Sequence, residues 1–174
     1  DLEKIALTNS LSRKISNKEL TIDEAKSEFI HLQHASLQYS FLTNFFAAAI
    51  ACGFFLFMFG GVASDCWIAV IAGGSAFLTF SFVQRYIQIK FFSEFVAAAV
   101  VISIAATFTK LGIATNQDII TIASVMPLVP GILITNAIRD LLAGELLAGM
   151  SRGVEAALTA FAIGAGVAIV LLII

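Results

Sequence analysis

Five apolar stretches, each about as long as a bilayer is thick, constrain this chain more than any other feature. They cover residues 41–59, 67–83, 92–108, 119–138 and 154–174. A helix needs roughly 20 apolar residues to cross the hydrocarbon core of a membrane. Lipid cannot hydrogen-bond to an exposed backbone, so such stretches span as helices. The sequence therefore predicts an all-α fold, a polytopic membrane helical bundle of about five transmembrane helices.

Charge content agrees with a membrane-embedded chain. Only 13% of the residues are charged and 59% are hydrophobic, whereas soluble domains are close to one quarter charged. The net charge of -2 is too near neutral for a nucleic-acid-binding protein. We expect membrane lipid as the surroundings and no nucleic acid as a partner.

Residues 1–40 differ in character from the rest and form a separate predicted domain, ahead of a transmembrane domain over 41–174. Apolar residues between Leu2 and Ile15 recur at helical spacing and predict an amphipathic helix. Thr21 and Glu24 have the spacing of a capping box, which opens a second helix continuing through Leu37. We expect this helical segment to lie in the cytoplasm.

Basic residues in the connections predict the orientation of the spans. The N-terminal segment holds five of the ten basic residues, and Arg85, Lys90, Arg139 and Arg152 follow the second and fourth stretches. Lys110 alone follows the third. Because cytoplasmic loops carry an excess of Lys and Arg, the pattern predicts a cytoplasmic N-terminus and a C-terminus on the outer face.

The small residues, the cysteines and the histidines are interpreted as structural. Alanine and glycine clusters such as Gly73-Gly74 predict close helix packing inside the membrane. Cys52 and Cys66 read as small apolar residues. His31 and His34 stand three residues apart, but no cysteine or third histidine joins them, so we expect no metal and no cofactor.

The fourth stretch contains the two prolines of the chain. They are Pro127 and Pro130, and Gly131 follows directly. Proline lacks the backbone donor and clashes with the preceding turn, so this Pro-x-x-Pro-Gly motif predicts a broken fourth span. Non-helical backbone at membrane depth persists where protein or a water-filled cavity satisfies it, and transporters use such breaks to bind solutes.

A polar stripe follows the break. Thr135, Asn136, Arg139 and Asp140 share one side of the expected helix at i, i+4 spacing. With Pro130 and Gly131, these four are the candidate substrate-binding residues, Arg139 being suited to a carboxylate. Alternatively, Arg139 and Asp140 only mark the cytoplasmic end of the span.

Acidic and basic residues beyond this stripe are candidates for coupling or gating. Glu145 lies between two Leu-Leu pairs that read as a short interfacial helix, and Arg152 and Glu155 follow three residues apart. A local ion pair between Arg152 and Glu155 is the alternative to a functional role for them.

Residues 127–155 resemble the signature of the threonine/serine exporter family (ThrE, with the YjjP-type inner-membrane proteins). The matching pattern is P-x-x-P-G-x-x-x-T-N-A-I-R-D-L-L-A-G-E-L-L-A-G-x-x-R-x-x-E. The resemblance implies a bacterial inner-membrane secondary exporter of small amino acids such as threonine and serine. Some YjjP-type members are linked with export of dicarboxylates such as succinate. It also implies a YjjB-like second membrane module, fused or as a partner chain.

The small-residue helix faces leave lateral surfaces for a partner, so we expect a homo-oligomer, a complex with a YjjB-like module, or both. Two other functions compete with this transporter module, the first being a structural subunit that scaffolds a transporting partner. An intramembrane enzyme is disfavoured because the sequence contains no G-x-S-x-G, H-E-x-x-H or C-x-x-C motif.

Overall fold

The computed structural model describes residues 2–34, 39–87 and 89–174, and all the regular secondary structure in these ranges is helical. The chain divides into two compact units, Asp1–Phe41 and Leu42–Ile174. The all-helical prediction is confirmed. Each unit is described by itself below.

The first unit is a helical hairpin. Helices α1 (Leu2–Ser16) and α2 (Ile22–His34) are joined by a turn in which Lys18 has a φ of 58°. An ion pair of 3.5 Å between Lys14 Nζ and Glu28 Oε2 bridges the two helices. The expected continuation of the second helix to Leu37 lies outside the described residues.

The predicted capping box is present at the start of α2. The Thr21 backbone N–H donates to Glu24 Oε2 at 2.9 Å, and the Glu24 N–H donates to Thr21 Oγ1 at 3.4 Å. The Thr21 hydroxyl also donates to Glu24 Oε2. Hydrogen bonds from the Thr21 backbone, and then from its hydroxyl, hold the pKa of Glu24 below its ordinary value.

This depressed pKa makes the first turn of α2 sensitive to acid. The box stabilises α2 above the pKa of the unfolded chain, and that contribution is lost as the pH falls through the lower folded pKa. Carboxyl NMR titration of Thr21→Val should give Glu24 a higher pKa than in the wild type, since one donor is lost. Thr21→Ser, which keeps the hydroxyl, should titrate like the wild type. Equal values in all three proteins would mean that the Thr21 hydroxyl does not lower the pKa of Glu24.

The second unit contains the membrane helices. Helices α3, α4, α5 and α8 are each long and apolar enough to cross a membrane. Helix α6 with the 3-10 turn η2, followed by α7, passes the same test as a pair bent by 62°. About five spans with a broken fourth were predicted, and the structure agrees. The bounds are α3 (Phe41–Met58), η1 (Ala63–Asp65), α4 (Cys66–Tyr86), α5 (Phe92–Lys110), α6 (Gln117–Val125), η2 (Met126–Leu128), α7 (Gly131–Leu142) and α8 (Leu146–Ile173).

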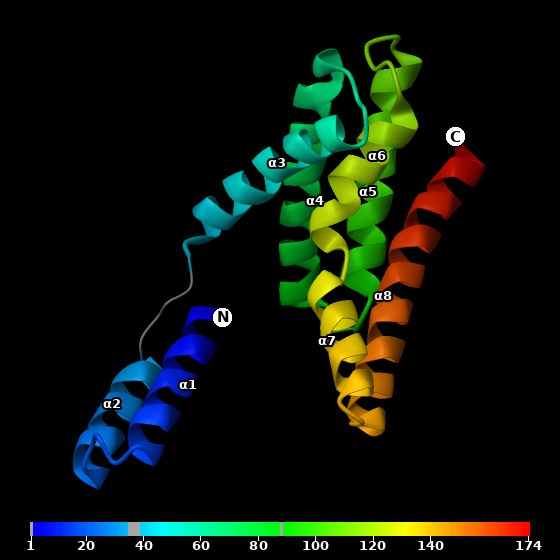
Figure 1. Cartoon of the computed structure of the whole chain (residues 1–174). Helices are drawn as coiled ribbons and strands as arrows, with labels where there is room; N and C mark the ends of the chain where they lie inside the picture. The colour runs from blue at the N-terminus through cyan, green and yellow to red at the C-terminus, as the bar shows by residue number, and fades with distance from the viewer. Residues whose placement is uncertain (1, 35–38, 88) are drawn as a thin grey trace. The chain divides into compact units, whose positions relative to one another are not determined.

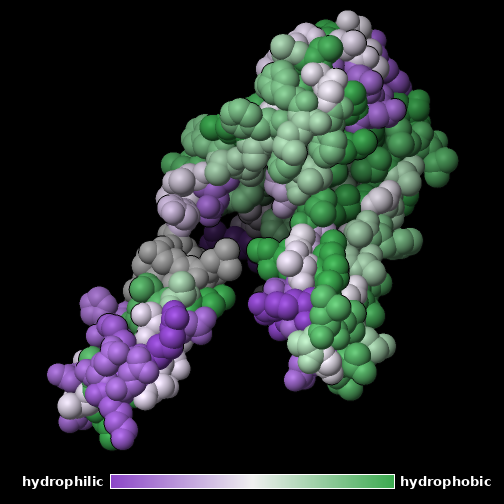
Figure 2. Space-filling view, in the orientation of Figure 1, coloured by the Kyte–Doolittle hydropathy of each residue, from purple (hydrophilic) through white to green (hydrophobic). Residues whose placement is uncertain are grey.

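Within this unit, α5 packs between α4 and α8, α6 lies on α4 and α5, and α7 runs along α8 (Figure 1). The α4–α5 and α7–α8 connections lie at one end of the bundle. The α3–α4 and α5–α6 connections and the C-terminus lie at the other. Helix α3 leans away from α4 toward its own N-terminal end. The side of the unit seen in Figure 2 is mainly hydrophobic along α3 and α8, as lipid contact requires.

Small residues allow the close helix contacts that the sequence predicts. A Cβ at Gly73 of α4 would collide with Cys52 Sγ of α3, and one at Gly166 of α8 would collide with the carbonyl oxygen of Phe95 in α5. Ala97 and Ala98 of α5 are fully buried. Gly164 is different, because nothing lies within 4 Å of its Cβ position. Backbones therefore approach each other at specific crossings.

A buried carboxylate fixes the end of the bundle opposite the α4–α5 turn. Asp65, in η1, is 1% exposed. Its oxygens accept from the backbone N–H groups of Thr115 and Asn116 at 3.1 Å, and from Ser64 Oγ at 3.3 Å. Asn116 then caps α6 through the N–H groups of Asp118 and Ile119. Asp65 thus joins the start of α4 to the start of the broken span.

The expected short interfacial helix around Gly144 is wrong. Gly144 has a φ of 85°, its N–H donates to Leu141 O at 3.1 Å, and the Glu145 N–H donates to Asp140 O at 2.9 Å. These two bonds form a Schellman motif, which ends α7. Helix α8 begins at Leu146, earlier than the span predicted from residue 154. The two Leu-Leu pairs are the facing ends of α7 and α8.

Candidate functional site

The break in the fourth span is a short extended segment between two helices. After η2, Val129 has φ -65° and ψ 130°, and Pro130, with φ -78° and ψ 54°, precedes α7. The Gly131 N–H donates to Val129 O at 2.8 Å, outside the helical pattern. Helix termini leave backbone groups without intrahelical partners, so the break presents polar backbone to its surroundings.

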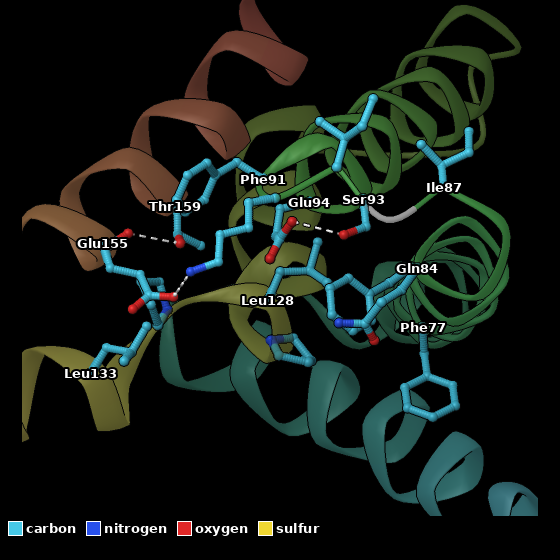
Figure 3. A pocket seen from close by; sticks show the side chains of 15 residues that line it. Phe77, Gln84, Ile87, Phe91, Ser93, Glu94, Leu128, Leu133, Glu155 and Thr159 are labelled. Carbon is cyan, nitrogen blue, oxygen red and sulfur yellow. Dashed lines mark hydrogen bonds and ion pairs between the residues drawn. The ribbon is translucent and has the colours of Figure 1, made fainter. Parts of the chain in front are cut away.

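A cavity of about 560 Å³ lies beside this break. Its volume falls in the range of roughly 300–1,000 Å³ that is usual for ligand pockets. It is partly open and is lined by the C-terminal part of α4, the α4–α5 turn, the start of α5, the break, the start of α7, and α8 (Figure 3). The lining residues are Phe77, Phe80, Gln84, Ile87, Ile89, Lys90, Phe91, Ser93, Glu94, Pro127, Leu128, Pro130, Leu133, Glu155 and Thr159.

Three charged side chains line this cavity among mainly apolar residues. Lys90 Nζ and Glu155 Oε1 are 3.3 Å apart and join the α4–α5 turn to α8. Glu94, on the first turn of α5, accepts from Ser93 Oγ at 2.9 Å. Figure 3 shows Glu155 and Thr159 on one side of the cavity and Glu94 and Ser93 on the other. With one lysine and two glutamates, the cavity has a net negative charge.

Two buried hydroxyls add acceptors to the same space. Ser93 is 4% exposed and Thr159 is 6% exposed. The Ser93 hydroxyl donates a hydrogen bond to the Glu94 carboxylate, and the Thr159 hydroxyl donates one to Glu155 O at 3.0 Å. A hydroxyl that has donated its proton still has lone pairs to accept with. Both groups are therefore hydrogen-bond acceptors toward anything in the cavity.

Phe91, directly before α5, has a strained backbone conformation. Its φ of 68° places it in the left-handed region, where residues other than glycine are rare. The turn that it makes carries the chain from Lys90 directly into α5, so that Lys90 and Glu94 line the same cavity. Strained backbone of this kind is concentrated at functional sites.

The structure brings only some of the predicted site residues to this cavity. Pro127, Pro130 and Glu155 line it, and Gly131 follows at the first position of α7. Thr135 donates its hydroxyl to Gly131 O at 2.9 Å, so it satisfies the backbone at the break.

Asp140 and Arg152 bind each other. A short contact joins Arg152 Nη1 to Asp140 Oδ2 and ties α7 to α8. The local Arg152–Glu155 pair considered above is therefore wrong, because both residues have partners on other elements. Glu155 is one turn further along α8 and pairs with Lys90. The tight α7–α8 turn, which is not visible in a linear pattern, brings Asp140 within reach of Arg152.

The remaining candidates lie away from the cavity. Arg139 and Glu145 are exposed, and Asn136 is half-buried on the side of α7 that carries Asp140. Within the described ranges Arg139 makes no ion pair. Its role as a carboxylate ligand stays a prediction from the sequence.

Sequence reasoning missed most of the polar lining. Lys90 was interpreted only as a topology signal, and Gln84, Ser93, Glu94 and Thr159 were not considered as ligands. Glu94 offered a signal, since it is a lone carboxylate at the start of an apolar stretch, and such residues are costly near a membrane. The others contact the cavity only because three helices converge on the break.

No group of three or more His, Cys, Asp and Glu suited to a metal ion occurs in the part of the chain that the structure describes. The side chain of His34 lies outside that part. His31 lies in the first unit, at a small pocket of about 220 Å³ with Lys14 and Glu28.

These features together define a polytopic helical membrane protein in which a broken span adjoins a charged cavity. The chain belongs to the ThrE family, whose model, described as "Putative threonine/serine exporter", matches residues 1–174. The predicted family is thereby confirmed over the whole chain. Neither the curated proteins nor the solved structures gave a match.

Proposed function

We propose that this chain is the substrate-carrying module of a secondary exporter of threonine, serine and similar small amino acids, and that the cavity beside the break is its transport site. The observation that carries the proposal is the convergence of Lys90, Glu94 and Glu155 on a cavity walled by both prolines of a span bent by 62°. Ionisable residues that face a cavity in a helical membrane bundle mark substrate or ion pathways. The family match supports the choice of substrate.

The position of the cavity in the bundle fits an exporter that loads from the cytoplasm. Arg85 and Lys90 lie at the α4–α5 end of the bundle, and the α7–α8 turn near Arg139 and Arg152 lies at the same end. By the positive-inside tendency this end faces the cytoplasm, with the N-terminal unit on that side of a bacterial inner membrane. The cavity lies nearest this end and would receive solute from inside the cell.

Cysteine labelling tests this orientation. In a background with Cys52→Ala and Cys66→Ser, a cysteine at Ser64 should react with an impermeant reagent from outside intact cells. A cysteine at Ile89 should react only after the membrane is opened. Ser64 and Ile89 lie beyond opposite ends of α4, so reaction of both from the same side would exclude the proposed topology.

A second membrane module of the YjjB type is part of the proposal. Its support is the resemblance over residues 127–155 and the large apolar residues that remain exposed along the transmembrane helices, such as Phe46, Phe54, Leu158 and Phe161. Such faces contact lipid or another chain, which includes a second copy of this one. Reconstitution with and without each partner distinguishes these possibilities.

Flux of labelled solute from proteoliposomes is the deciding experiment. The purified chain is reconstituted alone and with a YjjB-type partner, and the proteoliposomes are loaded with threonine, serine or succinate. We expect saturable efflux of threonine and serine that depends on this chain. Efflux of succinate alone would favour the dicarboxylate alternative. Equal efflux from the partner by itself would make this chain a non-transporting structural subunit.

A further inference from the structure

We infer that a zwitterionic amino acid binds by displacing the Lys90–Glu155 ion pair. The substrate carboxylate takes the place of Glu155 beside Lys90, and the substrate ammonium group takes the place of Lys90 beside Glu155. The inference rests on the proposed function, because it names the groups that would hold the substrate in that same cavity. It assigns opposite ligand charges to two residues on different elements.

The exposure of the pair is suited to exchange. The side chains of Lys90 and Glu155 are 76% and 39% exposed, and their charged atoms are 3.3 Å apart. Exposed pairs of this kind contribute little to stability, so opening the pair costs little. The Arg152–Asp140 pair is less exposed, at 43% and 14%, and holds α7 to α8. The two neighbouring pairs on α8 therefore have different roles, one displaceable and one structural.

The rest of the cavity favours an ammonium group near Glu155. Thr159, one turn further along α8, and Ser93 both have their hydroxyl protons engaged and offer acceptors. Glu94 supplies a second carboxylate on the facing wall. An ammonium group has three donors and no acceptor, which matches this set.

A dicarboxylate fits the same set poorly. It would bring two negative charges to a cavity that already holds two carboxylates and one ammonium group. Like charges at short range disfavour binding, so the polar lining selects against succinate. Glu94 is then a specificity-determining residue, since it would repel a second substrate carboxylate and attract an ammonium group.

The test combines side-chain variants with ligands that lack one charge. Binding of labelled L-threonine to the purified full chain is measured with L-threoninol, which has no carboxylate, and N-acetyl-L-threonine, which has no ammonium group, as competitors. Lys90→Gln should weaken threonine about tenfold but leave threoninol binding unchanged or tighter, because Glu155 is released. Glu155→Gln should weaken threonine and threoninol by a similar factor and spare N-acetyl-threonine.

A matched control uses the ion pair of the first unit. Lys14→Gln and Glu28→Gln remove charges from a pair of 3.5 Å that lies outside the cavity, and they should leave all affinities unchanged. The reversed pair, Lys90→Glu with Glu155→Lys, keeps the ion pair but reverses its direction. We expect it to bind threonine more weakly than the wild type, because Thr159 and Glu94 no longer match the reversed charges.

Three outcomes would overturn the inference. Equal weakening of threonine and threoninol by Lys90→Gln would mean that Lys90 recognises no carboxylate. Wild-type affinity in the reversed pair would mean that the pair is a latch with no substrate contact. Absence of threonine binding to the wild-type chain would overturn the proposed function as well. Glu155→Asp, a shorter carboxylate, serves if Glu155→Gln does not fold.

Discussion

Replacing Asp65 with alanine should strongly destabilise the membrane unit. The carboxylate is buried and holds the backbone N–H groups of Thr115 and Asn116. Alanine removes the carboxylate that accepts from these donors. Hydrogen bonds to charged groups contribute roughly 1.5–3 kcal/mol each, so we expect a loss of about 2–4 kcal/mol in the free energy of unfolding.

Denaturant unfolding of the purified chain in detergent measures this effect. Asp65→Asn keeps one acceptor oxygen and should fall between the wild type and Asp65→Ala. Asp118→Ala provides the control, because Asp118 is an exposed carboxylate at the start of α6, close to the same turn. A similar loss in Asp118→Ala and Asp65→Ala would show that the effect is one of general charge and not of the buried bonds.

The break in the fourth span should be the most sensitive feature for transport. In Pro130→Ala/Gly131→Ala, alanine restores the missing backbone donor and favours helix. The bend of 62° between the two half-helices should then relax. Because Pro127, Pro130 and Leu133 form one wall of the cavity, we expect threonine flux to fall at least about tenfold, while insertion and expression hold.

Gly131→Ala alone is the matched control for this double substitution. Nothing lies within 4 Å of the Cβ position at Gly131, and its φ is not in the left-handed region. The single variant should therefore transport nearly as the wild type does. Flux is compared at equal protein content in proteoliposomes. Wild-type flux in the double variant would reduce the break to a packing feature.

The overall helical fold and the break were predictable because both depend on local chemistry. Span length follows from apolar run length, and the break follows from Pro130 in an apolar run. The capping box of Thr21 and Glu24 is equally local, and its bonds are present. In each of these cases the residues that determine the structure are within a few positions of each other in the sequence.

The polar lining of the cavity was not predictable in the same way. Lys90 and Glu155 are 65 positions apart, and only the packing of α5 against α8 brings them together. Arg152 pairs with Asp140 and not with Glu155, because the Schellman turn at Gly144 folds α7 back along α8 and brings Asp140 within reach of Arg152. Asp65 was missed because a carboxylate just before a span is usually a solvated end residue, whereas here two backbone N–H groups bind it.

Substrate protection of a single cysteine tests most directly whether threonine occupies this cavity. Gln84 lines the cavity, whereas its neighbour Arg85 is exposed on the same helix and does not. In the background without native cysteines, Gln84→Cys and Arg85→Cys are labelled by a small thiol reagent with increasing L-threonine. The account predicts saturable protection of the cysteine at position 84 and unchanged labelling at position 85. Labelling at position 84 that threonine does not slow would contradict the assignment of the cavity as the transport site.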